Sequence, residues 1–268
     1  MSRLHLTFAC GSCTLAGTLD TAPGQTGLLI VSGGNEIRAG AFGGQAALAA
    51  AIARAGFPVF RFDRRGIGDS EGENRGYRAS ARDIASAREA FRAIAPDVER
   101  VVALGNCDAA SALMLAGGEG FEGLILSNPW TIEAEDGGDS TEPATMPAAS
   151  IRQRYAEKLR NPREVARLLR GGVDLRKLAR GLAQSVRSAS PPSGLADEMR
   201  SALATYQGRV SILLAGADRT AQAFRESWEA DDARISLCEG AGHAYVVPEH
   251  RAWLEAKVLA ALRAVASG

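Results

Sequence analysis

Short runs of apolar residues, each bounded by glycine or polar residues, alternate along the chain with segments of helical periodicity. The runs have the length of strands buried on both faces. Strands are expected at 27–31, 57–63, 101–104, 121–126, 210–215 and 234–238, and helices at 44–55, 77–94, 109–115 and 249–265. Such alternation predicts an α/β fold: a mostly parallel, doubly wound sheet with helices on both faces, joined by right-handed crossovers.

A long segment after residue 130 breaks this pattern. Residues 131–148 are acidic and rich in Gly, Pro, Ser and Thr, a composition typical of loops. Residues 151–189 are helical in pattern and strongly basic. We therefore predict an α/β core formed by residues 1–130 and 206–268. A helical cap is predicted at 131–205, where an insertion would cover an active site.

The charge balance and the lack of long apolar stretches limit the partners of the chain. Lys plus Arg and Asp plus Glu each number 31, so no net charge attracts nucleic acid. No stretch approaches the roughly 18 apolar residues of a membrane span, and the apolar run at the start is too short for a signal peptide. We expect a cytoplasmic protein with no nucleic-acid partner and no transmembrane segment.

Cys10 and Cys13 have C-x-x-C spacing, which occurs in zinc and redox sites. A zinc site needs a second pair of ligands, whereas the chain has three His and no other C-x-x-C. A redox pair lies at a helix start after a strand, whereas these residues separate two strand-like segments. We predict a hairpin that turns at Gly11 and Ser12, thiols that stay reduced, and neither a metal nor a cofactor.

The segment from Gly105 to Ala109 has the form of a nucleophile elbow. The strand at 101–104 turns at once into a helix, and Cys107 stands at the corner. The corner residue has a strained backbone, and only small residues fit two positions before and after it, as Gly105 and Ala109 do. The helix N-terminus also favours a thiolate at Cys107. A buried structural cysteine is the alternative.

Asp218 and His243 follow later strands, in the chain order nucleophile, acid, histidine that this fold requires. Asp218 comes just after the strand at 210–215, and His243 lies in a glycine-rich loop after the last strand. A thiol attacks a carbonyl better when a histidine holds its proton and a carboxylate fixes the histidine tautomer. We predict Cys107, His243 and Asp218 as a catalytic triad. Alternatively, Asp218 caps a helix and His243 is a surface residue.

Two backbone N–H groups are expected to stabilise a negatively charged oxygen beside Cys107. One belongs to Asp108, the residue after the nucleophile. The other belongs to the loop after the first buried strand, where Gly34 is the first candidate and Asn35 the second. A plain glycine turn is the alternative for this loop.

Together these segments resemble the α/β-hydrolase superfamily over residues 27–130 and 210–265. More narrowly, the chain resembles the exosortase A system-associated hydrolase 1 family, which also has cysteine at the elbow; segments 60–72, 105–112, 126–130 and 171–175 carry this similarity. The resemblance implies a cytoplasmic hydrolase or acyl-transfer enzyme without a cofactor, and it leaves the substrate open. Dienelactone hydrolases also use cysteine, with a glutamate near the resting thiol, and Glu36 is the candidate for such a residue here.

A G-x-S-x-G string, the usual elbow motif of that superfamily, occurs at 68–72 around Ser70. No buried strand runs directly into it and no helix is expected to begin at Ser70, so it lacks the context of an elbow. We interpret it as a chance match.

The leading prediction is hydrolysis of a carboxylic ester, thioester or lactone of a small molecule through an acyl-Cys107 intermediate. An acyltransferase that uses the same thioester is the first alternative, because the basic segment at 151–189 fits an anionic or carrier-bound acceptor. A non-catalytic binding protein of the same fold is the second. The presence of all three triad residues argues against it.

Overall fold

The computed structural model describes residues 2–132 and 194–268, whose strands form one eight-stranded sheet. In spatial order the strands are β1 (Arg3–Cys10), β2 (Cys13–Asp20), β4 (Val59–Phe62), β3 (Thr26–Val31), β5 (Arg100–Asn106), β6 (Gly123–Ser127), β7 (Arg209–Ala215) and β8 (Ile235–Cys238). β1 pairs antiparallel with β2, and β2 with β4, whereas β3 to β8 are parallel. The mostly parallel sheet predicted from the sequence is confirmed.

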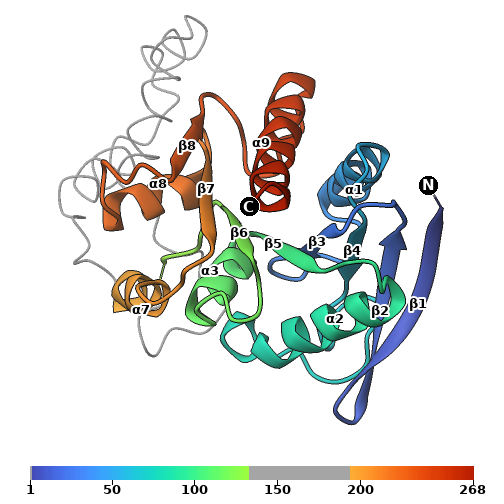
Figure 1. Ribbon diagram of the computed structural model, residues 1–268. Coiled ribbons are helices and arrows are strands. Elements are labelled where there is room, and N and C mark those ends of the chain that lie inside the picture. Colours follow the sequence, from blue (N-terminus) through green and yellow to red (C-terminus); the bar gives the residue numbers. More distant parts are fainter. Residues whose placement is uncertain (1, 133–193) are drawn as a thin grey trace, which may run out of the picture.

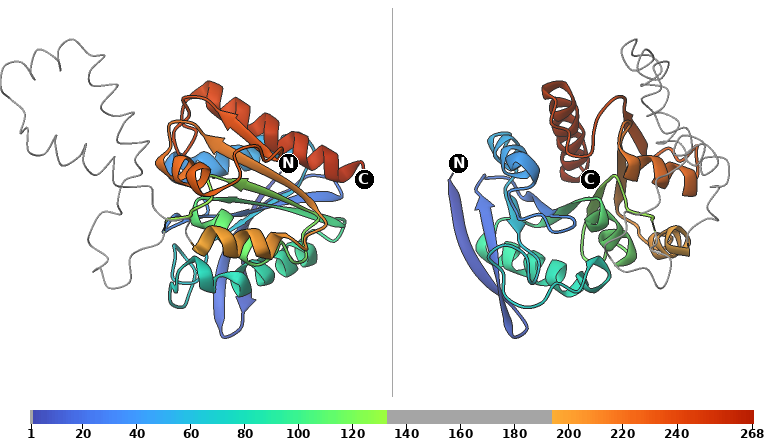
Figure 2. Two further views of the ribbon diagram at one scale, coloured as in Figure 1. Left: turned by 90° about the vertical axis from the view of Figure 1, so that its left-hand side faces the viewer. Right: turned by 180° about the vertical axis from the view of Figure 1, so that it is seen from behind.

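Helices cover both faces of this sheet (Figure 1, Figure 2). One face carries α1 (Gly44–Arg54) and α9 (Pro248–Ala266); the other carries α2 (Ala81–Ile94), α3 (Asp108–Leu115), α7 (Gly194–Leu203) and α8 (Arg219–Ser227). Successive side chains of a strand point to opposite faces. Leu28 and Ile30 of β3 accordingly pack toward α1 and α9, and Leu29 and Val31 toward the other helices. This two-sided burial explains why central strands such as β3 and β6 are continuous apolar runs.

The hairpin predicted at the start of the chain is present. Cys10 and Cys13 are Cα partners across β1 and β2, and Gly11 in the turn has a φ of 62°. Both thiols are free. Within residues 2–132 and 194–268, no group of three or more His, Cys, Asp or Glu side chains is arranged to hold a metal ion. In the same ranges no helix is long and apolar enough to cross a membrane.

Some predicted boundaries differ from the structure. The helix expected at 77–94 begins at Ala81, because residues Tyr77–Ala79 form a separate 3-10 turn, η2, after Gly76 with a φ of 74°. A second such turn, η1 (Ala41–Gly43), precedes α1. The cap predicted at 131–205 falls mostly on residues 133–193, outside the described residues. Its last part is α7, which packs against α3.

The carboxyl ends of the parallel strands bring distant parts of the sequence to one edge of the sheet. Gly34 follows β3, Cys107 follows β5 and Asn128 follows β6. Asp218 follows β7, and His243 lies in the loop after β8. This edge is where open α/β sheets bind ligands, and every residue predicted for the site lies along it.

Candidate active site

Cys107 occupies a strained corner between β5 and α3. Its φ and ψ are 61° and −128°, a conformation that residues other than glycine rarely adopt. A Cβ on Gly105 would lie 2.7 Å from the backbone of Ala109, so only glycine fits there. The Cys107 N–H donates to the carbonyl of Ser127 at 2.9 Å, which ties the corner to the end of β6. The elbow geometry predicted from the sequence is confirmed.

Replacing Cys107 with glycine is expected to give a protein about 1 kcal/mol more stable than Cys107→Ala. Both variants lose the thiol, but only glycine relieves the positive φ, a strain worth about 1–3 kcal/mol. The larger entropy that glycine loses on folding offsets part of this gain. Urea unfolding followed by circular dichroism measures the difference. Equal stabilities would show that the corner stores no strain.

His243 and Asp218 form a hydrogen-bonded pair next to this corner. Nδ1 of His243 lies 2.9 Å from Oδ2 of Asp218, whose side chain is 9% exposed. The same carboxylate caps α8 by accepting the N–H of Ala221 at 3.2 Å. The N–H of Ala217 donates to the carbonyl of Ala241 at 2.9 Å, which holds the two loops together. Asp218 therefore caps a helix and contacts the histidine at once.

The neighbours of His243 stabilise its charged form. The hydrogen bond with Asp218, and a second one with Cys107, raise the pKa of the ring to about 10 against the opposing effect of burial. Both contacts come from residues predicted for the triad. The structure thus brings Cys107, His243 and Asp218 together.

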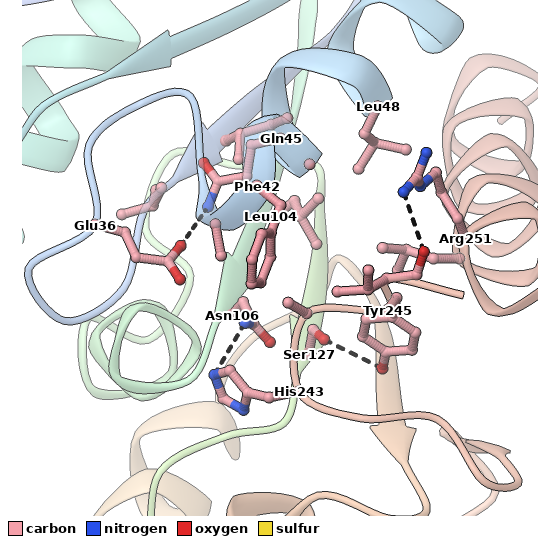
Figure 3. Close-up of a pocket in the computed structure, with 17 residues that line it drawn as sticks. Glu36, Phe42, Gln45, Leu48, Leu104, Asn106, Ser127, His243, Tyr245 and Arg251 are labelled. Atoms are coloured by element: carbon pink, nitrogen blue, oxygen red, sulfur yellow. Dashed lines mark hydrogen bonds between the residues drawn. The ribbon is translucent and has the colours of Figure 1, made fainter. Parts of the chain in front are cut away.

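Two asparagines that the sequence analysis did not single out lie beside the same ring. Nδ2 of Asn106 is 3.2 Å from Nε2 of His243 (Figure 3). Nδ2 of Asn128 is 3.0 Å from Oδ1 of Asn106. Asn106 ends β5 and Asn128 follows β6. A polar side chain at the carboxyl end of a buried parallel strand is the sequence signal that would have marked both.

The backbone N–H of Gly34, a candidate oxyanion donor, already has an acceptor. It donates to Oδ1 of Asp108 at 2.6 Å. Nη2 of Arg64 donates to the Gly34 carbonyl at 2.6 Å and lies 3.5 Å from Oδ2 of Asp108. Gly33 packs against the elbow, where a Cβ would lie 2.4 Å from the carbonyl oxygen of Asn106. Gly34 therefore lies beside the elbow with its N–H bound to a carboxylate.

Other polar candidates from the sequence have partners of their own. Oδ1 of Asn35 accepts a hydrogen bond from Asn74 at 3.0 Å, and Glu36 accepts one from Gln45 at 3.4 Å. Ser70 is buried; its hydroxyl donates to a backbone carbonyl at 2.6 Å and accepts a backbone N–H at 2.9 Å. The hydroxyl therefore holds the loop in place, and the G-x-S-x-G string has no elbow.

An apolar pocket of about 80 Å³ adjoins His243 and Asn106. Figure 3 shows these two side chains at one end of the pocket and Leu48 farther along it. The side chain of Phe42, which is 88% exposed, lines the same pocket. Most of the lining is contributed by aliphatic and aromatic side chains: Ile30, Val31, Ala41, Phe42, Leu48, Leu104, Ala244, Tyr245, Val246 and Leu254.

Comparison with known proteins gave one family match and many structural ones. A model of the Alpha/beta hydrolase family matches residues 28–257. No curated protein matches the chain. The fold is similar to the esterase Pf2001 of Pyrococcus furiosus, at 12% identity over 98% of this chain and 92% of that chain, with a TM-score of 0.63.

Two other solved structures show the same likeness. The alpha/beta hydrolase GrgF of Penicillium sp. sh18 is 16% identical over 100% of both chains, with a TM-score of 0.63. XC6422 of Xanthomonas campestris, an a/b serine hydrolase without lid, is 14% identical over 98% of this chain and 94% of that chain, with a TM-score of 0.58. At these identities the likeness concerns the fold alone.

Proposed function

The chain belongs to the alpha/beta hydrolase family, and on that premise we propose that it hydrolyses a carboxylic ester, thioester or lactone of a small molecule through an acyl intermediate on Cys107. The position of His243 between Asp218 and Cys107 carries the proposal. A histidine held between a carboxylate and a nucleophile is the arrangement that acyl transfer requires. The resemblance to exosortase-associated hydrolases with cysteine at the elbow supports the same nucleophile.

In the proposed reaction, the sulfur of Cys107 attacks the carbonyl carbon of the substrate while Nε2 of His243 takes the thiol proton. Asp218 accepts the Nδ1–H of the ring and stabilises the imidazolium. The tetrahedral intermediate then expels the leaving group, which receives the proton from His243, and a thioester remains on Cys107. Water attacks this thioester with His243 as base, which releases the acid and restores the thiol.

Backbone N–H groups of Asp108 and Gly34 are proposed to stabilise the oxyanion. Asp108 begins α3, and the first N–H groups of a helix have no acceptor within the helix. The N–H of Gly34 is bound to the Asp108 carboxylate, so it becomes free for substrate only when that carboxylate moves. This proposal therefore includes a displacement step before the oxyanion can form.

The pocket beside His243 supports a substrate with a compact apolar group. Its lining is mostly aliphatic and aromatic, and its volume of about 80 Å³ accommodates only a few heavy atoms. A short acyl chain fits this space better than a long one. For this reason acetyl and propionyl esters are the appropriate first substrates.

Trapping the intermediate tests this proposal. Wild-type protein and Cys107→Ala are each mixed with p-nitrophenyl acetate, release of p-nitrophenol is followed, and acid-quenched samples are digested for mass spectrometry. We expect an acetyl group on the peptide that contains Cys107, and hydrolysis by Cys107→Ala no faster than in buffer. Cys10, Cys13 and Cys238 serve as internal controls for non-specific acetylation. Equal hydrolysis by both proteins would eliminate the proposal.

Acyl transfer to a sugar or carrier is a second candidate, favoured by the thioester that a cysteine nucleophile forms and by the basic segment at 151–189. It uses the same triad and differs only in the acceptor. Product analysis with and without an alcohol acceptor separates the two: a hydrolase releases free acid in both, whereas a transferase forms a new ester when the acceptor is present.

A further inference from the structure

Asn128 is a buried asparagine that the proposed reaction does not use. Its side chain is fully buried and its φ is 44°, unusual for a residue other than glycine. The N–H of Ala215 donates to Oδ1 of Asn128 at 2.8 Å. A backbone N–H can only donate, so the amide oxygen must face Ala215 and the NH₂ group must face the opposite way.

The NH₂ group of Asn128 in turn fixes the direction of Asn106. It lies 3.0 Å from Oδ1 of Asn106 and 3.4 Å from the carbonyl oxygen of His243, which can only accept. Since the oxygen of Asn106 faces Asn128, its NH₂ group faces Nε2 of His243, at 3.2 Å. A backbone N–H at the end of β7 thus determines, through two amides, which group Asn106 presents to the ring.

An N–H donor at Nε2 is compatible with only one state of the histidine. Nε2 can accept a hydrogen bond only when it carries no proton, and Nδ1 must then hold the proton that it donates to Asp218 at 2.9 Å. This is the neutral tautomer that can take a proton from a thiol at Nε2.

We propose that Asn128 and Asn106 form a positioning relay that holds the His243 ring in its neutral, Nδ1-protonated form. Nε2 has a single lone pair, so the Asn106 N–H must leave it before Nε2 takes the Cys107 proton. The inference rests on the proposed function, because it gives His243 the role of base toward Cys107. Asn106 contacts Nε2, the atom that takes the thiol proton, but neither asparagine gives or takes a proton in this scheme. Asn128 acts through Asn106, and both act through the ring.

The relay opposes the other contacts of the ring. Asp218 and Cys107 favour the imidazolium and raise the pKa of His243 to about 10, whereas the Asn106 N–H favours the neutral ring. A base that is already protonated at neutral pH can take no further proton. The relay therefore keeps part of the base available. Asp218 and Cys107 are the charged and titratable groups that contact the ring. Glu36, Tyr245 and Arg251 line the pocket that the ring adjoins.

Reversing the relay with isosteric variants tests the inference. In Asn128→Asp, the carboxylate still accepts the Ala215 N–H but has no N–H for Asn106. The Asn106 amide then turns its oxygen toward Nε2, which favours a proton there. The His243 titration midpoint, measured from ¹⁵N shifts of labelled ring nitrogens, is expected to rise by about one pH unit. His243→Gln identifies the signal among three histidines.

Uncharged variants separate the relay from a simple charge effect. Asn106→Ala removes the donor, and Asn128→Ala frees the Asn106 amide to turn; neither adds a negative charge. Both are expected to raise the midpoint, and to move the acid limb of the pH–rate profile upward, because the base is lost as pH falls through its pKa. Circular dichroism verifies folding, and the surface variant Asn74→Ala is the matched control.

The outcomes for the relay and for the hydrolase proposal are distinguishable. An unchanged or lower midpoint in folded Asn106→Ala and Asn128→Asp would overturn the relay, whatever the activity. The titration needs no turnover. A raised midpoint in a protein that never acylates Cys107 would therefore support the relay and count against the hydrolase alone.

Discussion

Replacing Asp218 with asparagine is expected to lower kcat for ester hydrolysis by about 10⁴-fold while the protein stays folded. Oδ2 of Asp218 accepts the Nδ1–H of His243 at 2.9 Å. The amide of the new asparagine can present its NH₂ group at this position. Nδ1 of His243 must then accept a hydrogen bond from it, so the proton of the neutral ring moves to Nε2. A ring with its proton on Nε2 cannot take the Cys107 proton. Steady-state kinetics with p-nitrophenyl acetate measures the loss.

The second role of Asp218 supplies the control for this experiment. Its carboxylate caps α8 through the N–H of Ala221. Oδ2 makes both contacts, so an asparagine side chain that turns its NH₂ group to Nδ1 gives up the bond from the Ala221 N–H. Asp218→Asn should thus lose about as much stability as Asp218→Ala, about 1 kcal/mol for a lost cap, and circular dichroism of both variants shows that this loss leaves the protein folded. Activity of Asp218→Asn within tenfold of wild type would remove the carboxylate from the proposed mechanism.

The centre of the sheet could be predicted because its strands are buried on both faces. All residues of β3 are buried, so the sequence shows an unbroken apolar run there. Helix α8 was missed because its residues, Arg219 to Ser227, include polar side chains and only a short buried stripe. The separate turn at residues 77–79 was missed because Gly76, rather than an apolar period, sets the boundary.

The backbone context of the candidate site was also accessible from the sequence. Cys107, Asp218 and His243 each follow a strand, and the carboxyl ends of parallel strands meet at one edge whatever the details of packing. The contact between Gly34 and the Asp108 carboxylate was not accessible. It joins residues 74 positions apart and depends on the direction of one side chain. The Asn106–Asn128 relay depends similarly on the orientation of two amides.

Asp108 consequently has two opposing roles in the proposed site. Its backbone N–H is positioned at the start of α3 to stabilise an oxyanion, while its side chain binds the second donor. A carboxylate at that position also places negative charge where the transition state develops it. Arg64 offsets this charge only in part, since its Nη2 lies 3.5 Å from Oδ2 and contacts the Gly34 carbonyl more closely.

Asp108→Ala is therefore expected to raise kcat/KM for p-nitrophenyl acetate by about 10- to 100-fold. It frees the N–H of Gly34, and one oxyanion donor is worth about 10²- to 10³-fold in rate. Some of that gain is expected to be lost because Arg64, a buried cation, then lacks its counter-charge. The gain should appear in kcat rather than in KM, because the donor acts on the transition state.

Asp108→Asn separates occupancy of the donor from charge. The asparagine keeps an oxygen that can accept the Gly34 N–H but carries no negative charge. If the rate is limited because the Gly34 N–H is bound to the side chain of residue 108, kcat rises much less in Asp108→Asn than in Asp108→Ala. If the negative charge of the carboxylate limits the rate, kcat rises equally in the two variants. A lower rate in both, with unchanged melting temperature, would mean that the carboxylate holds the Gly34 loop in its working position. The displacement step would then have to be removed from the mechanism.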